Sequence, residues 1–595
     1  MKSLKYLNKY FLKYKWHLIA GIVFTVVSNF FAVKMPVLVK DTINHYVETL
    51  GNLTFENAIW LAIKTGGIYL ALTIAKGIFL FLVRQSIIMM SRQIEYDLKN
   101  EIFNQYLKLD FSFYKRNNTG DLMNRISEDV SLVRMYLGPG VMYTINLVVL
   151  FVLVIVQMIA INGTLTLFVL IPLPLMSFLI YKVSSSMSRL SSEVQKEQST
   201  LSTLAQETFS GIRIIKAYQR EEQIHDKFNS SADNYKNKSM RLIMVNSLFM
   251  PTISFLIGLS TVILIYLGGI MTINETITVG DIVAFVFFVN MLTWPFASVG
   301  WVTSIIQRAA ASQTRINQFL EATPEIKNNN FDDFTFKGKI EFKNVSYTYP
   351  NTGIQAIENL SFVVEKGKTF AIIGRTGSGK STILHLLTRN IQPDSGQILI
   401  DGIDISMINL DQFRAQIGIV PQEVFLFSDT ISYNISFGLE NRNVSIEELR
   451  EVAKRAHVLH NIEDFPAQFD TLLGERGVNL SGGQKQRISI ARALIRKPKL
   501  LLLDDCLSAV DTETEEIILR NLVDESIERT TLIVSHRISS LRNADKMILI
   551  DKGQKVEEGS HDELIALNGQ YAEIYEKQLI DEAEESEESE EAAAE

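Results

Sequence analysis

Six long apolar segments in the first half of this 595-residue chain constrain its fold more than any other feature. Each is close to, or longer than, the roughly 20 apolar residues that a helix needs to cross a bilayer. In chain order they are Trp16–Pro36, Ala58–Val83, Met142–Ile161, Leu165–Tyr181, Leu242–Ile270 and Ile282–Ile306. The fourth is the shortest and contains Pro172 and Pro174, which leaves its ends open. We predict an all-α transmembrane domain of six helices over residues 1–322.

The distribution of basic residues predicts the orientation of this domain. Five lysines lie within the first 15 residues, and the loops after the second and fourth segments are long and basic. The loops after the first, third and fifth segments are short and poor in Lys and Arg. Because cytoplasmic loops carry the excess of positive charge, we expect a multi-pass protein of the cell membrane (plasma or inner) with both termini in the cytoplasm.

The two long basic loops have helical periodicity with charged faces, so the membrane helices are expected to extend into the cytoplasm. Each extension needs a turn at its tip. Asn117–Gly120 supplies the first turn, and the second is expected near Ala217–His225. These tips are predicted to dock onto whatever lies below the membrane.

The composition changes after Ala322. Residues 323–338, with Asn328–Asn330 and Asp332–Asp333, are predicted to be a linker. From there to residue 575, short β-branched runs alternate with helical ones, the pattern of an α/β domain with a largely parallel core sheet. The expected strands are Lys339–Val345, Thr369–Ile373, Gln397–Ile400, Ile417–Val420, Leu500–Leu503, Thr531–Val534 and Lys546–Ile550.

The net charge of −8 arises at the C-terminus. Residues 581–595 contain nine carboxylates and no basic residue, so the rest of the chain is nearly neutral. We expect residues 576–595 to be an acidic disordered tail, and nothing indicates nucleic-acid binding. The single cysteine, Cys506, excludes an intramolecular disulfide. It is interpreted as a small buried residue, with a redox sensor as the alternative.

The sequence GRTGSGKS follows an expected strand and precedes an apolar helix, which is the context of a P-loop. Its glycines allow backbone N–H groups to close around phosphate oxygens. Lys380 reaches the β- and γ-phosphates, and Ser381 can ligate Mg²⁺. The predicted nucleotide-binding residues here are Gly374, Arg375, Thr376, Gly377, Ser378, Gly379, Lys380, Ser381 and Thr382.

The buried run Leu500–Asp504 ends in a carboxylate at the sheet edge where ligands bind in open α/β folds. Asp504 is predicted to hold Mg²⁺, directly or through water, and a structural salt bridge is the alternative. Asp505 is placed to orient or polarise the attacking water. His536, just after an expected strand, can contact the γ-phosphate.

The motif LSGGQ, about 100 residues after Lys380 and shortly before Asp504, makes the chain resemble the ATP-binding-cassette (ABC) family. The membrane half resembles the six-helix exporter type of that family. The resemblance covers about residues 1–575 and implies ATP and Mg²⁺ as cofactors. The LSGGQ motif is the family's signature and supplies Ser481, Gly482, Gly483 and Gln484. The other residues that the resemblance assigns are Tyr349 (adenine stacking), Gln422 (catalysis and metal binding), Glu475–Gly477 (the exporter segment just before the signature), Ser508–Asp511 (D-loop), His536 (switch histidine) and Thr119–Val130 (first coupling segment).

The resemblance also implies a half-transporter that works with a second chain. ATP is then held between Lys380 of one chain and the signature motif of the other. The physical basis is that Ser481 and its glycines open a helix N-terminus, which favours a γ-phosphate. Closure of the dimer is expected to turn the membrane cavity outward, and hydrolysis to reopen it.

Asp505 departs from the family, which usually has Glu at this position. Aspartate is one methylene shorter, and a misplacement of about 1 Å at a catalytic group can cost on the order of 100-fold in rate. In one interpretation the chain resembles the degenerate-site subunit of a heterodimeric bacterial exporter, and it completes a fast site on a partner. In the other it forms a homodimer with two slow sites. We favour the heterodimer, because Lys380, Gln422 and His536 are all kept.

The expected function is ATP-driven export of amphipathic small molecules or lipids. Six membrane segments exclude a soluble cassette ATPase of DNA repair or translation, and an importer usually keeps its membrane and nucleotide domains on separate chains. The alternative functions are a homodimeric lipid or drug flippase and an ATP-gated regulatory subunit. The sixth segment is rich in aromatic residues, which suit amphipathic substrates or serve bundle packing: Phe285, Phe287, Phe288, Trp294, Phe296 and Trp301.

Overall fold

The computed structural model describes residues 2–49, 55–328, 330, 332–439, 444–507, 510, 512–523, 529–538 and 541–580. The chain divides into two compact units. The first is drawn from Met1–Lys108 and Thr119–Ala322, and the second from Leu109–Asn118 and Thr323–Glu595. A short segment from the first half of the chain therefore packs with the second half.

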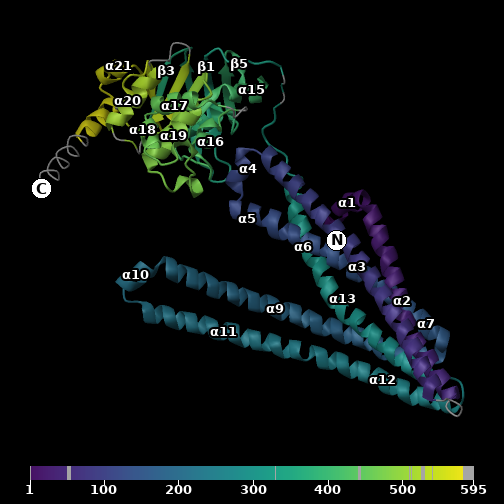
Figure 1. The fold of residues 1–595 in the computed structure, drawn as a ribbon. Helices are drawn as coiled ribbons and strands as arrows, with labels where there is room; N and C mark the ends of the chain where they lie inside the picture. The colour runs from purple at the N-terminus through teal and green to yellow at the C-terminus, as the bar shows by residue number, and fades with distance from the viewer. Residues whose placement is uncertain are drawn as a thin grey trace. The chain divides into compact units, whose positions relative to one another are not determined.

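The described part of the first unit is built from helices (Figure 1). Its long helices are α2 (Lys15–Thr49), α3 (Phe55–Lys108), α7 (Val141–Ile161), α9 (Pro172–Ser210), α11 (Glu221–Ser247), α12 (Phe249–Ile273) and α13 (Val279–Leu320). Its short elements are η1 (Ser3–Leu7), α1 (Asn8–Lys13), α5 (Thr119–Asn124), η2 (Arg125–Asp129), α6 (Val130–Met135), η3 (Tyr136–Gly140), α8 (Gly163–Leu170) and α10 (Ile212–Ala217). The two expected turns are confirmed, between α4 and α5 and between α10 and α11.

Five helical stretches of the described residues are long and apolar enough to cross a membrane. They are Lys15–Thr49, Phe55–Lys108, Thr119–Ile161, Glu221–Ile273 and Val279–Leu320. The expected fourth segment, Leu165–Tyr181, differs because it is divided at Ile171 between α8 and α9. The physical reason is Pro172, which has no N–H group to continue the hydrogen bonding of α8. The helical transmembrane domain is confirmed, with this interruption in its fourth segment.

Two kinds of contact hold α13 in the bundle. Phe285 and Phe288 are fully buried in an apolar core that they share with α7, α8 and α12. At the start of the helix, the Gly280 N–H donates to the Asn44 side chain at 3.0 Å, and Lys40 pairs with Asp281 at 3.0 Å. The sixth apolar segment is therefore fixed against the first.

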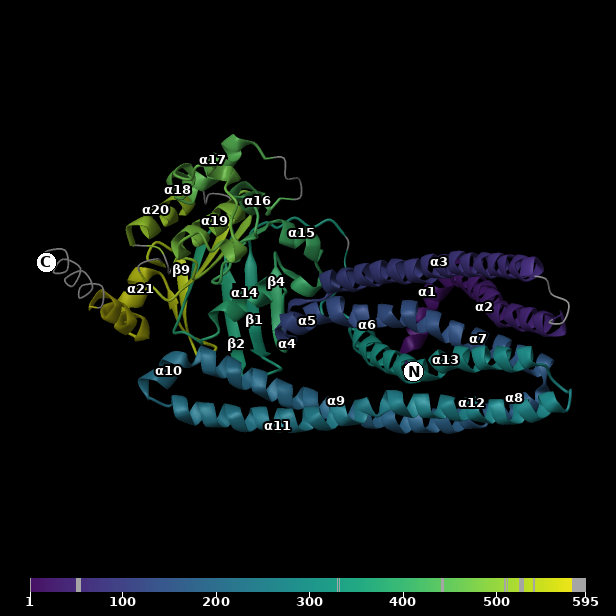
Figure 2. The same ribbon diagram turned by 60° about the horizontal axis from the view of Figure 1, so that its bottom comes forward.

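The second unit contains two sheets (Figure 2). A six-stranded sheet has the order β10-β9-β3-β8-β7-β6, and a four-stranded antiparallel sheet has the order β2-β1-β4-β5. The strands are β1 (Ile340–Thr348), β2 (Gln355–Val364), β3 (Thr369–Ile373), β4 (Ser395–Ile400), β5 (Ile403–Asp404), β6 (Ile417–Val420), β7 (Leu500–Asp504), β8 (Thr530–Ser535), β9 (Lys546–Asp551) and β10 (Gln554–Gly559). All but the β9–β10 pairing of the large sheet is parallel, as predicted.

Helices cover the large sheet on both faces. They are α14 (Lys380–Leu387), α15 (Leu410–Ala415), α16 (Ile431–Ser436), α17 (Ile446–Arg455), α18 (Leu459–Glu463), α19 (Gly482–Leu494), α20 (Thr512–Val523) and α21 (His561–Ala566). The short helix α4 (Phe111–Arg116) also belongs to this unit and has no buried residue. Alternate residues of one strand enter different cores: Leu501 and Leu503 face one, and Leu500 and Leu502 the other. Burial on both faces explains why the central strands are continuous apolar runs.

Three strands were not predicted, namely β2, β5 and β10. All three are antiparallel and lie at or next to a sheet edge, where one face can stay polar. The predicted tail boundary also needs correction, because residues 576–580 continue the helix that begins at residue 570. Gln578 is hydrogen-bonded to the backbone around residue 537, which ties down this end of the helix. The remaining predicted tail, 581–595, lies outside the described residues.

Candidate nucleotide-binding and hydrolysis site

The P-loop joins β3 to α14, as the sequence predicts. Two of its glycines have the left-handed backbone, with φ of 83° at Gly377 and 102° at Gly379. A Cβ atom on Gly379 would collide with the carbonyl oxygen of Ala356, and one on Gly374 with that of Ile550. The loop therefore approaches two neighbouring strands closely enough that only glycine fits.

The Lys380 ammonium lies against its own loop. It donates to the carbonyl oxygens of Gly374 at 2.7 Å and Arg375 at 3.0 Å. Burial lowers the pKa of Lys380, although Asp505 and Asp504 oppose the shift. The Lys380 ammonium is therefore already held at the mouth of the loop. A phosphate oxygen bound there can replace these carbonyls as its hydrogen-bond acceptor.

Ser381 and Asp504 form the candidate metal site. The Ser381 hydroxyl donates to the Asp504 carboxylate at 3.0 Å. Asp504 is 8% exposed, and burial raises its pKa. A carboxylate that is costly to keep charged, beside a hydroxyl oxygen, fits Mg²⁺, which takes oxygen ligands and often few of them from the protein.

The three residues predicted to be catalytic meet at the end of β7. Asp505 accepts from the Gln422 amide at 3.2 Å with one carboxylate oxygen, and its other oxygen lies 2.7 Å from Nδ1 of His536. Its backbone N–H donates to the Val534 carbonyl at 2.8 Å. The Nδ1 atom of His536 thus faces Asp505, and its Nε2 atom is left for another contact.

Asp505 also has an unusual backbone, with φ of 46°. Left-handed backbone is uncommon for residues other than glycine but is several-fold enriched in Asp and Asn. The next residue, Cys506, is buried, and burial raises the pKa of its thiol. This agrees with the interpretation of Cys506 as a small buried residue. Of the predicted D-loop, Ser508, Ala509 and Asp511 lie outside the described residues.

The signature motif caps α19. The Ser481 hydroxyl accepts from the Gln484 N–H at 3.3 Å, and the Gln484 side chain accepts from the Ser481 N–H at 3.0 Å. This reciprocal capping leaves the N–H groups of the glycines at the helix start pointing outward. Ser481 and Gly482 are exposed, so this end of α19 is accessible to a second chain.

Tyr349, the predicted adenine-stacking residue, already has partners. Its hydroxyl lies 3.0 Å from that of Thr382, and the Lys115 ammonium lies 4.0 Å from the centre of its ring. Beside it, Phe111 stacks on His385 with ring centres 4.9 Å apart. Helix α4 therefore contacts the residue expected to receive adenine, a contact that the sequence did not reveal.

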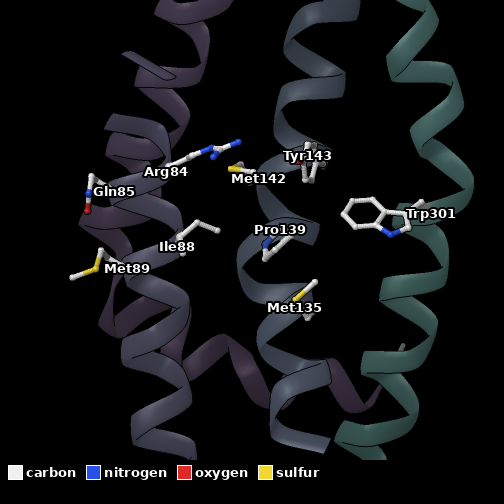
Figure 3. Close-up of a pocket in the computed structure, with 9 residues that line it drawn as sticks. All are labelled: Arg84, Gln85, Ile88, Met89, Met135, Pro139, Met142, Tyr143 and Trp301. Carbon is white, nitrogen blue, oxygen red and sulfur yellow. The ribbon is translucent and has the colours of Figure 1, made fainter. Parts of the chain in front are cut away.

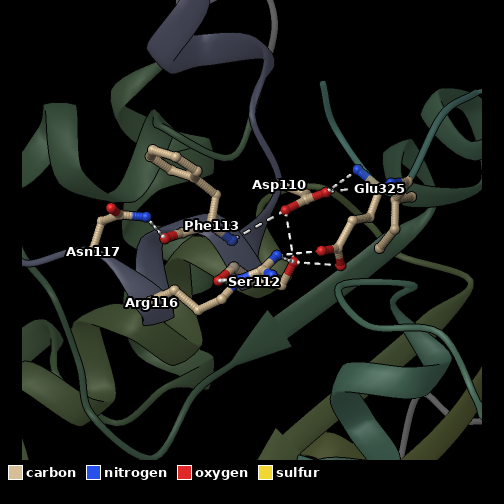
Figure 4. A network of polar contacts seen from close by, with 7 residues as sticks. Asp110, Ser112, Phe113, Arg116, Asn117 and Glu325 are labelled. Atoms are coloured by element: carbon tan, nitrogen blue, oxygen red, sulfur yellow. Dashed lines mark hydrogen bonds and ion pairs between the residues drawn. The ribbon is translucent and has the colours of Figure 1, made fainter. Parts of the chain in front are cut away.

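A polar network fixes the segment Leu109–Asn118 (Figure 4). One Asp110 oxygen accepts from the Phe113 N–H and the Ser112 hydroxyl, and the other from two backbone N–H groups at Glu325 and Ile326. Arg116 pairs with the Glu325 carboxylate. Although partial burial raises the pKa of Asp110, these hydrogen bonds outweigh it and lower the pKa. The helix-capping pattern at Asp110 is the one sequence signal that could have located this network.

The helical unit contains a separate cavity of about 540 Å³ (Figure 3). Tyr143 and Trp301 pack edge to face at this cavity, with ring centres 5.2 Å apart. The cavity is lined by Arg84, Gln85, Ile88, Met89, Met135, Pro139, Met142, Tyr143 and Trp301. Of the aromatic residues singled out in the sixth segment, Phe285 and Phe288 serve packing, and Trp301 faces this cavity. The side chain of Phe296 lies outside the described part of the chain.

A helical membrane unit and a P-loop unit with a capped signature helix define an ABC transporter. Family models agree: residues 18–296 match the ABC transporter transmembrane region, and residues 357–508 match the ABC transporter model. The chain belongs to this family. It is therefore an ATPase in which hydrolysis is coupled to transport, and a multi-pass membrane protein.

Several proteins are similar over most of their length. A probable multidrug resistance ABC transporter ATP-binding/permease protein of Bacillus subtilis is 34% identical, with 98% of each chain covered. The multidrug resistance-like ATP-binding protein MdlA of Escherichia coli is 35% identical, with 83% of each covered. An ATP-dependent lipid A-core flippase of Aromatoleum aromaticum is 32% identical, with 82% of this chain and 80% of the flippase covered.

A solved structure of a bacterial Atm1-family ABC exporter with ATP bound has a TM-score of 0.78 and 26% identity. The match covers 95% of this chain and 98% of that one. The chain is thus a half-transporter of the exporter type, with one membrane unit and one nucleotide unit. Exporters of this type work as dimers with a second chain.

Proposed function

We propose that this chain is one half of a heterodimeric exporter and that its own ATP site hydrolyses nucleotide slowly. One observation carries the proposal: Asp505 takes the place of the expected glutamate while Lys380, Gln422 and His536 are kept and gathered around the same site. A site that had lost its function altogether would have no need to keep these three partners.

In this proposal each residue has a defined role. Lys380 and the P-loop backbone bind the phosphates, and Ser381, Gln422 and Asp504 hold Mg²⁺. The bound ion neutralises charge on the transferred phosphoryl group. Asp505 orients the attacking water, and His536 contacts the γ-phosphate. The remaining roles are adenine binding by Tyr349 and completion of the partner's site by the signature residues Ser481, Gly482, Gly483 and Gln484.

Two features of Asp505 support slow hydrolysis. Its carboxylate is one methylene shorter than that of glutamate, and both of its oxygens are already bound, by Gln422 and by His536. An attacking water therefore has to share a carboxylate oxygen with one of these two partners. The left-handed backbone at Asp505 also favours Asp over Glu, which suits a site selected for binding more than for turnover.

The test is the ATPase activity of the purified chain in nanodiscs, alone and with its partner. Alone, the wild-type chain is expected to turn over slowly, and Asp505→Glu to raise kcat by on the order of 10- to 100-fold. Asp505→Asn serves as the matched control, because it keeps the length and removes the charge. Robust turnover by the wild-type chain alone would contradict the heterodimer.

A homodimeric drug or lipid flippase is the second candidate. It is favoured by the presence of a complete P-loop and a complete capped signature on the same chain, since two copies could form two equivalent sites. Mass spectrometry of the complex isolated from its native membrane separates the two candidates. A second polypeptide at equal stoichiometry supports the heterodimer, and two copies of this chain support the flippase.

The proposed cargo is an amphipathic small molecule or lipid. The cavity at Trp301 supports this, because it combines three methionines and two aromatic rings with the cationic Arg84. Methionine adapts to irregular apolar ligands. Trp301→Ala is expected to weaken stimulation of the ATPase by amphipathic compounds, measured as the concentration for half-maximal effect. The exposed Trp294, outside the cavity, gives the control Trp294→Ala.

We also propose that both termini are cytoplasmic, that residues 323–338 act as the linker and that residues 339–580, with the corrected terminal helix, form the nucleotide-binding domain. Basic loops support the orientation. Because Cys506 is buried, single cysteines introduced at Lys2 or Lys577 can be labelled selectively. Labelling by a membrane-impermeant reagent in intact cells would contradict the proposed orientation.

A further inference from the structure

The last helix of the described chain, residues 570–580, is docked on the nucleotide unit. Tyr571 is fully buried, and Ile574 and Tyr575 pack against the same apolar core. At its start, the backbone N–H groups of Gln570 and Tyr571 donate to the Glu557 carboxylate at 2.6 and 3.2 Å. Both ends of the packed face are therefore fixed to the fold.

Gln578 continues this packed face. It follows Tyr571 by seven residues and Ile574 by four, the spacing that places side chains in one stripe along a helix. An apolar residue would be expected at this position. The amide is explained by its surroundings: this end of the stripe lies beside the backbone of the loop that carries His536, where an amide can form hydrogen bonds.

The Gln578 amide makes two hydrogen bonds to that loop. Its Nε2 group donates to the His536 carbonyl at 2.7 Å, and its Oε1 atom accepts from the Ile538 N–H at 2.8 Å. The amide thus pairs with the backbone on both sides of Arg537, as a neighbouring strand would. Ile538 is fully buried, so the loop is held on its inner side while the His536 ring points outward, 45% exposed.

We propose that Gln578 is a positioning residue for His536: the terminal helix sets the place of the switch histidine through this side-chain amide. The proposal rests on the proposed role of His536 at the γ-phosphate and extends the site to a residue 42 positions further along the chain. Without the amide, the backbone of the loop can shift, and displacement of a catalytic group by about 1 Å can cost on the order of 100-fold in rate.

The experiment is ATP hydrolysis by the full-length chain alone in nanodiscs, so that all turnover comes from sites with its own Asp505 and His536, with kcat and KM measured separately. Gln578→Ala is expected to lower kcat by on the order of 10-fold with KM for ATP within about twofold, because the P-loop is untouched. The kcat of Gln578→Glu should fall by a similar factor, since a carboxylate cannot donate to the His536 carbonyl. Lys577→Ala, an exposed neighbour on the same helix, is the matched control and should leave both constants unchanged.

A double-mutant cycle separates positioning from a general structural effect. If Gln578 acts through His536, Gln578→Ala should change kcat little in a His536→Ala background. An equal fall in both backgrounds, or a fall accompanied by a raised KM, would overturn the proposal. The proposed slow site is judged separately, by whether Asp505→Glu raises the turnover of the chain alone, so failure of one does not imply failure of the other.

Discussion

At Gly379 the backbone has a φ of 102°, and its Cα faces the carbonyl oxygen of Ala356. Gly379→Ala should therefore weaken ATP binding by at least about 10-fold, since left-handed backbone alone costs an alanine roughly 1–2 kcal/mol and the collision adds to it. Binding of labelled ATP to the purified chain measures the effect. Gly402→Ala is the control, because Gly402 also has a positive φ, 83°, with open space around it. Equal loss in the two variants would contradict the collision.

The single residue His385 makes the stability of the nucleotide unit depend on pH. Burial, with a smaller effect of Lys115, lowers its pKa below the ordinary value of about 6.5. Between the folded and the ordinary pKa the unfolded chain binds more protons, so the free energy of unfolding rises with pH in that window and is flat above it. We expect the Tm of the nucleotide unit to fall as the pH is lowered from 7 to 5.

His385→Phe tests this assignment. The ring can still pack against Phe111, but it no longer titrates. The acid-induced fall in Tm should be smaller in this variant, measured by calorimetry across the same pH range. His225→Gln, on α11 of the helical unit, is the control and should keep the wild-type slope. An unchanged slope in His385→Phe would exclude His385 as the cause.

At the scale of elements, the sequence located the parallel strands and the P-loop because each has a strong local signal. The run at β7 is apolar on both faces, and the glycines before α14 have a fixed spacing. The edge strand β10 lacked such a signal, since only its last residue is fully buried. The contact of Lys115 with Tyr349 joins residues far apart in the chain, and no local pattern encodes it.

The capping boxes of α17 and α19 allow an element to be tested for function. Ser445 and Ser481 cap their helices in the same way, so Ser445→Ala and Ser481→Ala should each cost about 1 kcal/mol of stability. Only Ser481→Ala is expected to reduce the ATPase of the assembled dimer, because only α19 carries the signature. Denaturant unfolding and ATPase assays on both variants give the comparison. Equal loss of activity would show that stability alone is responsible.

For the whole molecule, Asp110 is the residue whose loss should separate ATP hydrolysis from transport. Asp110→Asn removes the charge that accepts four hydrogen bonds, so the segment Leu109–Asn118 should be held less firmly. We expect transport per ATP hydrolysed to fall several-fold while ATPase activity persists, measured in proteoliposomes. The control is Asp121→Asn. Asp121 is an exposed carboxylate on α5, and among the described ion pairs it contacts only Arg125, four residues further on. A parallel fall of transport and ATPase would contradict the prediction.

The membership of Leu109–Asn118 in the second unit has a consequence for synthesis of the protein. The ribosome makes this segment 205 residues before it reaches Thr323, where the rest of that unit begins. At roughly 5–20 residues per second, the segment waits about 10–40 s for its partners. During that interval Phe111 lacks His385, and Asp110 lacks the backbone of Glu325. The nucleotide unit therefore completes its fold only after translation of the membrane unit, and substitutions in this segment should lower the yield of folded protein as well as its coupling.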